Sequence, residues 1–141
     1  MAQFQKPVPA HLRIVGILSI IWMVFGCLSY LYDVTLSPEQ LAALPADQVA
    51  VMQATPSWIY ALFAIATWGG LIGAVLLFLK KRAAVLLLLI SWVAALAQFG
   101  GLFLTVPKAA ATGTVIPALI ISLGIAFWWY ARKADKEGWL G

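Results

Sequence analysis

The chain has 141 residues, of which 64% are hydrophobic and 10% are charged, and its formal net charge is +4. Soluble domains carry roughly 45–50% apolar and about 25% charged residues, and a small domain buries only about two-thirds of the surface that its unfolded chain exposes. The composition therefore excludes an ordinary water-soluble fold and predicts a protein whose solvent is the lipid bilayer.

Apolar runs of about 20 residues without a charge predict four membrane-spanning helices. These runs cover about 14–32, 57–79, 83–104 and 114–130. Continuous apolar blocks favour helices over the alternating segments of a membrane β-barrel. We expect one transmembrane domain, residues 1–141, with an all-α fold: an antiparallel four-helix bundle in which short connections join neighbouring helices.

The first run contains Val24-Phe25-Gly26-Cys27 and has two interpretations. A basic start, an apolar run and a Gly-Cys pair are typical of a lipoprotein signal sequence. Phe25 fits such a cleavage site poorly, because small residues are favoured before the glycine. We therefore expect an uncleaved helix in which Cys27 is a small buried apolar residue.

Residues 34–56 form the one sizeable segment outside the predicted spans. Ser37-Pro38-Glu39-Gln40 predicts a helix start, because serine caps a helix, proline suits its first position and glutamine completes a capping box. Pro45 then interrupts this helix and can begin another turn. One apolar side is formed by Leu41, Leu44, Val49 and Met52. We expect a short extracytoplasmic hairpin at the membrane surface, and the alternative is a lid over a cavity.

The second span contains small residues four positions apart, which lie on one face of a helix. This candidate helix-packing face comprises Ala66, Gly69, Gly70, Gly73 and Ala74. Small side chains let another backbone approach closely, which drives association between helices in lipid. The partner is either a helix of the same chain or a second copy, and the alternative is a glycine hinge in a transport path.

Three tryptophans lie near the middle of their spans, at the depth of three hydroxyl side chains. This candidate midplane pocket comprises Trp22, Thr67, Trp68, Ser91, Trp92 and Ser122. Facing inward together, these residues would suit stacking on a sugar or a flat apolar ligand. In the alternative, the tryptophans fill gaps or face lipid, and the hydroxyls bond their own backbone carbonyls. Gln98 is interpreted as an interhelical hydrogen-bond donor.

The distribution of Lys and Arg predicts the orientation of the chain. Eight of the nine lie on one side of the predicted spans, namely Lys6, Arg13, Lys80, Lys81, Arg82, Arg132, Lys133 and Lys136. The other side carries only Lys108. Positive charge is retained in the cytoplasm, so we expect a multi-pass protein of the bacterial inner membrane with both termini in the cytoplasm.

The predicted spans contain no ionisable residue in their interiors, whereas ion-coupled carriers hold at least one. His11 is the single histidine, and the sequence contains no readable nucleophile–base pair, metal-ligand cluster or phosphate loop. We therefore expect no enzymatic activity, no cofactor, no metal site and no nucleic-acid partner.

The segment TPSWIYALFAIATWGGLIGAVLLFLKKRAA, residues 55–84, followed by Ser91-Trp92, resembles a family of small four-helix bacterial inner-membrane proteins. Members of that family are often labelled "sugar transporter". The resemblance covers about residues 10–130, and its most distinctive part is the Trp-Gly-Gly element with the basic turn after it. The label implies a carbohydrate substrate.

From these patterns we predict a small polytopic protein of the lipid bilayer that acts through helix–helix association. It would serve as an accessory or scaffold subunit of a larger membrane complex, or as a homo-oligomer. The alternative is a facilitative transporter of a small neutral solute, with a sugar as the candidate.

Overall fold

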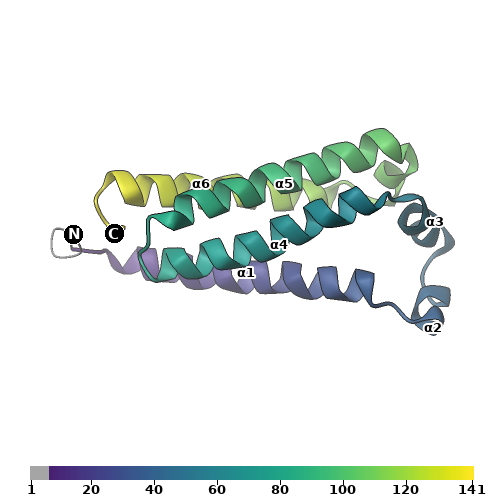
Figure 1. Cartoon of the computed structure of the whole chain (residues 1–141), viewed down its shortest axis with the longest axis horizontal. Helices are drawn as coiled ribbons and strands as arrows, with labels where there is room; N and C mark the ends of the chain where they lie inside the picture. Colours follow the sequence, from purple (N-terminus) through teal and green to yellow (C-terminus); the bar gives the residue numbers. More distant parts are fainter. Residues whose placement is uncertain (1–6) are drawn as a thin grey trace.

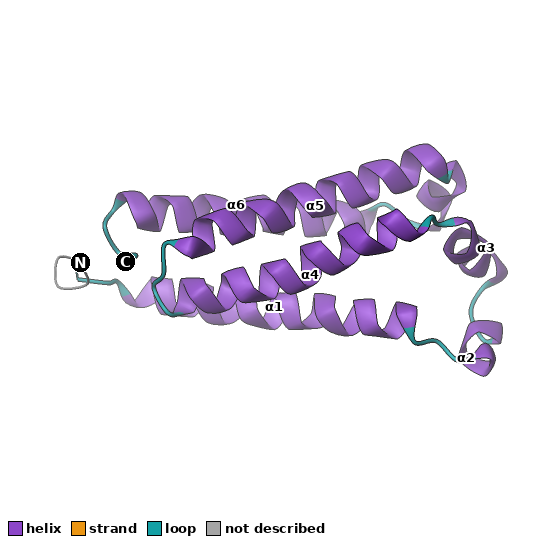
Figure 2. Ribbon diagram, in the orientation of Figure 1, coloured by secondary structure: helices purple, strands orange, loops and turns teal. Residues whose placement is uncertain are grey.

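The computed structural model describes residues 7–141, which form seven helical segments and no β-strand (Figures 1 and 2). The long segments are α1 (Ala10–Val34), α4 (Ser57–Phe78), α5 (Ala83–Thr105) and α6 (Val115–Lys136). The short segments are α2 (Pro38–Ala42), α3 (Ala46–Ala54) and the 3₁₀ helix η2 (Pro107–Thr112). The all-α prediction is confirmed. Lys6 lies outside the described residues.

Each of the four long helices has the length and the apolar composition needed to cross a membrane. They agree with the four predicted spans and indicate a small multi-pass integral membrane protein. Two helices are longer than their apolar runs: α1 begins at Ala10 and ends at Val34, and α6 continues to Lys136. The reason is that a helix ends where its backbone hydrogen bonds are interrupted, and not where its side chains become polar.

The long helices are packed in the order α1, α4, α5, α6. Helix α4 lies between α1 and α5, and α6 packs along α5. The start of α1 and the C-terminus lie at one end of the bundle, and α2 and α3 lie at the other (Figure 1). We call these the terminal end and the loop end. At the terminal end α1 and α6 meet, where His11 and the Tyr130 hydroxyl form a hydrogen bond.

A core of buried apolar side chains closes the terminal end, and Leu12 and Leu77 are almost fully buried in it. The chain after α6 completes this core. Gly138, with φ +78°, ends the helix in a Schellman motif in which Trp139 N donates to Ala134 O. This reversal brings the buried Leu140 into the core.

The last residue is held by the connection between α4 and α5. Gly141 N donates to Lys80 O at 2.8 Å, and Arg82 N donates to Gly141 O at 3.0 Å. Next to these bonds, Arg82 Nε and Asp135 Oδ1 form an ion pair at 2.9 Å. The terminal end is therefore fastened by backbone bonds as well as by packing.

At the loop end, the predicted capping box is present: the Ser37 hydroxyl accepts from Gln40 N, and the Gln40 side chain accepts from Ser37 N. Pro45 precedes α3, as its sequence position predicts. Residues 107–112 were expected to be a loop but form η2, which packs against α3 and α5. Pro117 lies in the first turn of α6. Backbone N–H groups in a first turn have no partner within the helix, so proline is tolerated there.

We expect Leu140→Ala to lower the free energy of unfolding by about 2–5 kcal/mol, the usual cost of replacing a buried leucine by alanine. Leu86→Ala changes an exposed leucine of α5 and should leave stability nearly unchanged. Thermal unfolding in a mild detergent, followed by circular dichroism, measures both variants. Equal midpoints for the two variants would contradict the assignment of Leu140 to the core.

Candidate functional site

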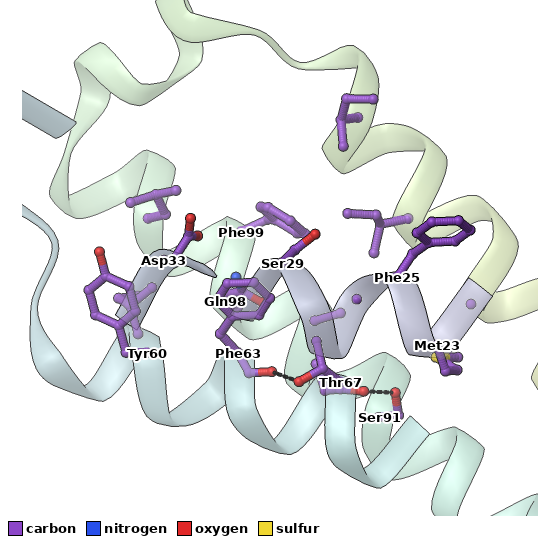
Figure 3. Close-up of a pocket in the computed structure, with 18 of the residues that line it drawn as sticks. Met23, Phe25, Ser29, Asp33, Tyr60, Phe63, Thr67, Ser91, Gln98 and Phe99 are labelled. Atoms are coloured by element: carbon purple, nitrogen blue, oxygen red, sulfur yellow. Dashed lines mark hydrogen bonds between the residues drawn. The ribbon is translucent and has the colours of Figure 1, made fainter. Parts of the chain in front are cut away.

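A cavity of about 510 Å³ lies between the long helices, in the half of the bundle nearer the loop end (Figure 3). Side chains of α1, α4, α5 and α6 form its walls, and Val51, Met52 and Thr55 line it at the loop end. The lining is predominantly apolar. Small-molecule pockets typically measure about 300–1,000 Å³ and have mostly apolar walls, so the cavity has the size and character of a ligand site.

The lining residues recur at helical spacing on two walls. On α1 they include Trp22, Gly26, Ser29 and Asp33. On α5 they include Ser91, Ala95, Gln98 and Leu102. In both helices the positions are i, i+4, i+7 and i+11, which is the pattern of one helix face. Each wall is therefore one continuous face of a single helix.

The floor of the cavity is formed by Met23 of α1 and Ser91 of α5, which lie against Gly70 of α4. A Cβ atom at this position would lie 2.6 Å from Met23 Sδ and 2.7 Å from Ser91 Oγ. Only a glycine therefore lets α1 and α5 approach α4 at this level. Beyond this floor, towards the terminal end, lies the core of buried apolar side chains that includes Leu12 and Leu77.

The hydroxyl groups near the floor are occupied by backbone carbonyls of α4. Ser91 Oγ donates across the helix interface to Ala66 O. Thr67 Oγ1 donates to Phe63 O at 2.9 Å within its own helix. Figure 3 shows both bonds at the side of the cavity. The Ser91 bond joins α5 to α4, and with both hydroxyls bonded this part of the wall has few free donors.

Trp92 connects α5 to α6. Its indole Nε1 donates to Ile121 O at 3.0 Å, so the acceptor is a backbone carbonyl of α6. A Cβ atom at Gly124 would lie 2.9 Å from Trp92 Cδ1, which shows that the indole lies directly against the α6 backbone. The ring thereby forms the wall between these helices.

Four members of the predicted midplane pocket line the cavity: Trp22, Thr67, Ser91 and Trp92. The other two do not. Trp68 is 40% exposed on the outer surface of α4, and Ser122 is exposed on α6. These residues were grouped by their depth along the helices alone. Successive side chains of a helix, however, point in directions about 100° apart around its axis. Trp68 therefore faces away although its neighbour Thr67 faces inward.

The predicted helix-packing face is also divided. Ala66, Gly70, Gly73 and Ala74 are buried within the chain, and a Cβ atom at Gly73 would lie 3.1 Å from Leu88 of α5. Gly69 has no neighbouring side chain or helix within 4 Å of a Cβ built at its position, so it does not belong to this face. The small residues therefore serve contacts between helices of the same chain.

The cavity also contains polar side chains that were not among the predicted pocket residues. Gln98 is only 7% exposed, and its amide has no hydrogen-bond partner among residues 7–141. The interhelical bond predicted for it is absent there. Asp33, Ser29 and Tyr60 also line the cavity, and Asp33 makes no ion pair within the same residues. The spacing of Trp22, Ser29 and Asp33 on one face was the signal that could have found them.

Within residues 7–141, no group of three or more His, Cys, Asp and Glu side chains is arranged to hold a metal ion. Cys27 is buried, and its Sγ contacts Thr67 O at 3.4 Å. The cavity offers apolar walls, the Gln98 amide and the Asp33 carboxylate.

Comparisons with protein-family models, with curated proteins and with solved structures found no match to this chain.

The adjacent glycines Gly69 and Gly70 allow a matched test of the close helix contact at Gly70. Gly70→Val should lower the free energy of unfolding by about 1–3 kcal/mol, the usual cost of overpacking. Gly69→Val should be neutral or slightly stabilising, because its Cβ has open space and valine forms helices better than glycine. Thermal unfolding in detergent measures the difference. Similar midpoints for both variants would mean that α1 and α5 do not meet at Gly70.

Proposed function

We propose that this chain is an integral membrane protein that binds a small, largely apolar molecule in the cavity between its long helices. The observation that carries the proposal is a cavity of about 510 Å³ with mostly apolar walls and with the Gln98 amide, which has no hydrogen-bond partner among residues 7–141. Pockets of this size and character are typical of sites for small molecules. A ligand that accepts from or donates to this amide would supply the partner that it lacks.

Helix–helix association with a second copy or a larger complex has less support. Its sequence basis was the small-residue face of α4, and most of that face is covered by α1 and α5. Close packing between helices in lipid depends on such small residues. Because they already serve packing within the chain, they leave little surface of this kind for a partner.

Facilitated transport of a small neutral solute is the second candidate function. The cavity lies towards the loop end, while the terminal end is closed by its packed core, as expected for one state of a carrier that opens to each side in turn. The resemblance to proteins labelled "sugar transporter" implies a carbohydrate. A sugar presents hydroxyls on most sides and each needs a partner, so the mostly apolar wall favours a less polar solute.

We propose further that the helices cross the bacterial inner membrane in alternating, antiparallel directions with both termini in the cytoplasm. The support is the position of the basic residues. In the described part of the chain, Arg13 and Lys80 belong to the terminal end, whereas Lys108 belongs to η2 at the loop end. Basic residues next to membrane spans are retained on the cytoplasmic side.

Cysteine labelling in intact cells tests this orientation. Gln48→Cys in α3 should react with a membrane-impermeant maleimide added outside the cells once the outer membrane is permeabilised. Glu137→Cys should react only after lysis, because the terminal end faces the cytoplasm. Both positions are exposed, and the native Cys27 is buried, so background labelling is low. The reverse pattern would place the loop end in the cytoplasm.

Filling the cavity tests the binding proposal. Ser29→Trp places a large ring in the cavity, whereas Leu28→Trp places the same ring on the exposed side of α1. Equilibrium dialysis of the purified protein against a neutral naphthalene probe, with protein-free micelles subtracted, measures affinity. We expect Ser29→Trp to weaken binding about tenfold, or about 1.4 kcal/mol, and Leu28→Trp to leave it unchanged.

Uptake of the same solute into proteoliposomes separates the two candidate functions. Binding without flux identifies a binding protein, and flux that Ser29→Trp abolishes identifies a carrier. Absence of both saturable binding and flux would count against both functions.

A further inference from the structure

The cavity is polarised along its length. Its floor is formed by Met23 and by Ser91, whose hydroxyl is already bonded to Ala66 O. At the opposite, loop-end side lie the Asp33 carboxylate and the Tyr60 hydroxyl (Figure 3). An occupant that matches this lining has an apolar body towards the floor and a polar group towards the loop end.

Asp33 is the charged group of this lining, and it lies in the last turn of α1. Among residues 7–141 the ion pair present is Arg82–Asp135 at the terminal end, so no basic side chain neutralises Asp33. Lys108 of η2 is exposed and makes no ion pair with it. A carboxylate next to an apolar cavity and without a cationic partner favours a ligand that supplies the positive charge.

The cavity also opens sideways between α1 and α6. Phe25 of α1 and Ile116 of α6 both line it, yet they are 63% and 62% exposed. These helices are in the bilayer, so the opening faces lipid in the half nearer the loop end. A molecule already dissolved in the bilayer can therefore enter with its apolar body first and keep its polar group near the membrane surface.

We propose that the ligand of this cavity is an amphipathic cation: an ammonium group beside Asp33 and Tyr60, joined to an apolar body that lies along the walls towards Met23. The inference rests on the proposed binding function and names the class of its ligand. An aromatic ring such as that of Tyr60 also attracts an ammonium group through its electron-rich face. Phe63 and Phe99 offer apolar contact to the body of the ligand.

The geometry sets the size of this ligand. Trp22 and Asp33 mark the two ends of the α1 wall, and eleven residues of helix rise about 16 Å. An aryl or branched group on a short alkyl chain that ends in an ammonium group fits this length and the volume of about 510 Å³.

A matched pair of ligands tests the charge. The first is a naphthylalkyl trimethylammonium ion, and the second is its uncharged isostere, in which carbon replaces the nitrogen. Dialysis in a neutral maltoside detergent, with protein-free micelles subtracted, measures both affinities. We expect the full-length protein to bind the cation about tenfold more tightly, as close charge pairs do, and higher salt to weaken binding of the cation alone.

Two substitutions that each remove one negative charge test whether Asp33 is the source of the preference for the cation. Asp33→Asn should reduce the affinity for the cation to that for the isostere and leave the isostere unaffected. Asp47→Asn, in exposed α3 and outside the cavity lining, should change neither. Unchanged binding of the isostere to Asp33→Asn also demonstrates that the cavity is intact.

The other possible outcomes also bear on the inference that the ligand is a cation. Equal affinity of the unsubstituted protein for both ligands overturns the inference and leaves the proposed binding function in place. A cation preference that Asp33→Asn retains overturns it as well. Absence of saturable binding for both ligands overturns the proposed function itself. If Asp33→Asn loses both ligands, the affinity ratio and salt dependence of the unsubstituted protein decide.

Discussion

The close approach of three helices at the small residues of α4 is the constraint on which the rest of the structure depends. Lipid provides no hydrophobic force between helices, so their association relies on close packing. At Gly70 the side chains of Met23 from α1 and Ser91 from α5 meet over the α4 backbone. On one side of this junction the core is filled. On the other, α4 carries Tyr60 and Phe63, which line space rather than fill it.

Hydropathy predicted the four long helices because few backbone conformations are stable in a bilayer. Backbone polar groups in lipid must bond within the segment, so a long apolar run becomes a helix. Hydropathy could not predict where the helices end, since backbone bonding continues through polar residues. Asp33 illustrates the consequence. It falls just beyond the predicted first span, but α1 continues through it and carries it to the cavity.

For the candidate site, the sequence predicted how deep each residue lies in the membrane but not which way its side chain points. Thr67 and Trp68 are neighbours at one depth, yet Thr67 is buried and Trp68 faces outward. Which face of a helix is buried depends on contacts with other helices, and every face of these helices is apolar, so the sequence contains little amphipathic signal. The polar residues Ser29, Asp33 and Gln98 are the exception, because their spacing alone marks the inward faces of α1 and α5.

The closed terminal end bears on which of the two proposed functions, binding or transport of a small molecule, the structure favours. Opening that end to water would expose Leu12, Leu77 and Leu140, which are buried there. Each such side chain contributes about 1.5–3 kcal/mol by staying out of water, and the backbone bonds of Gly141 would also break. A state several kcal/mol above the ground state is rarely populated. Exchange with lipid through the opening between α1 and α6 needs none of these contacts to break, so the geometry favours binding over carriage.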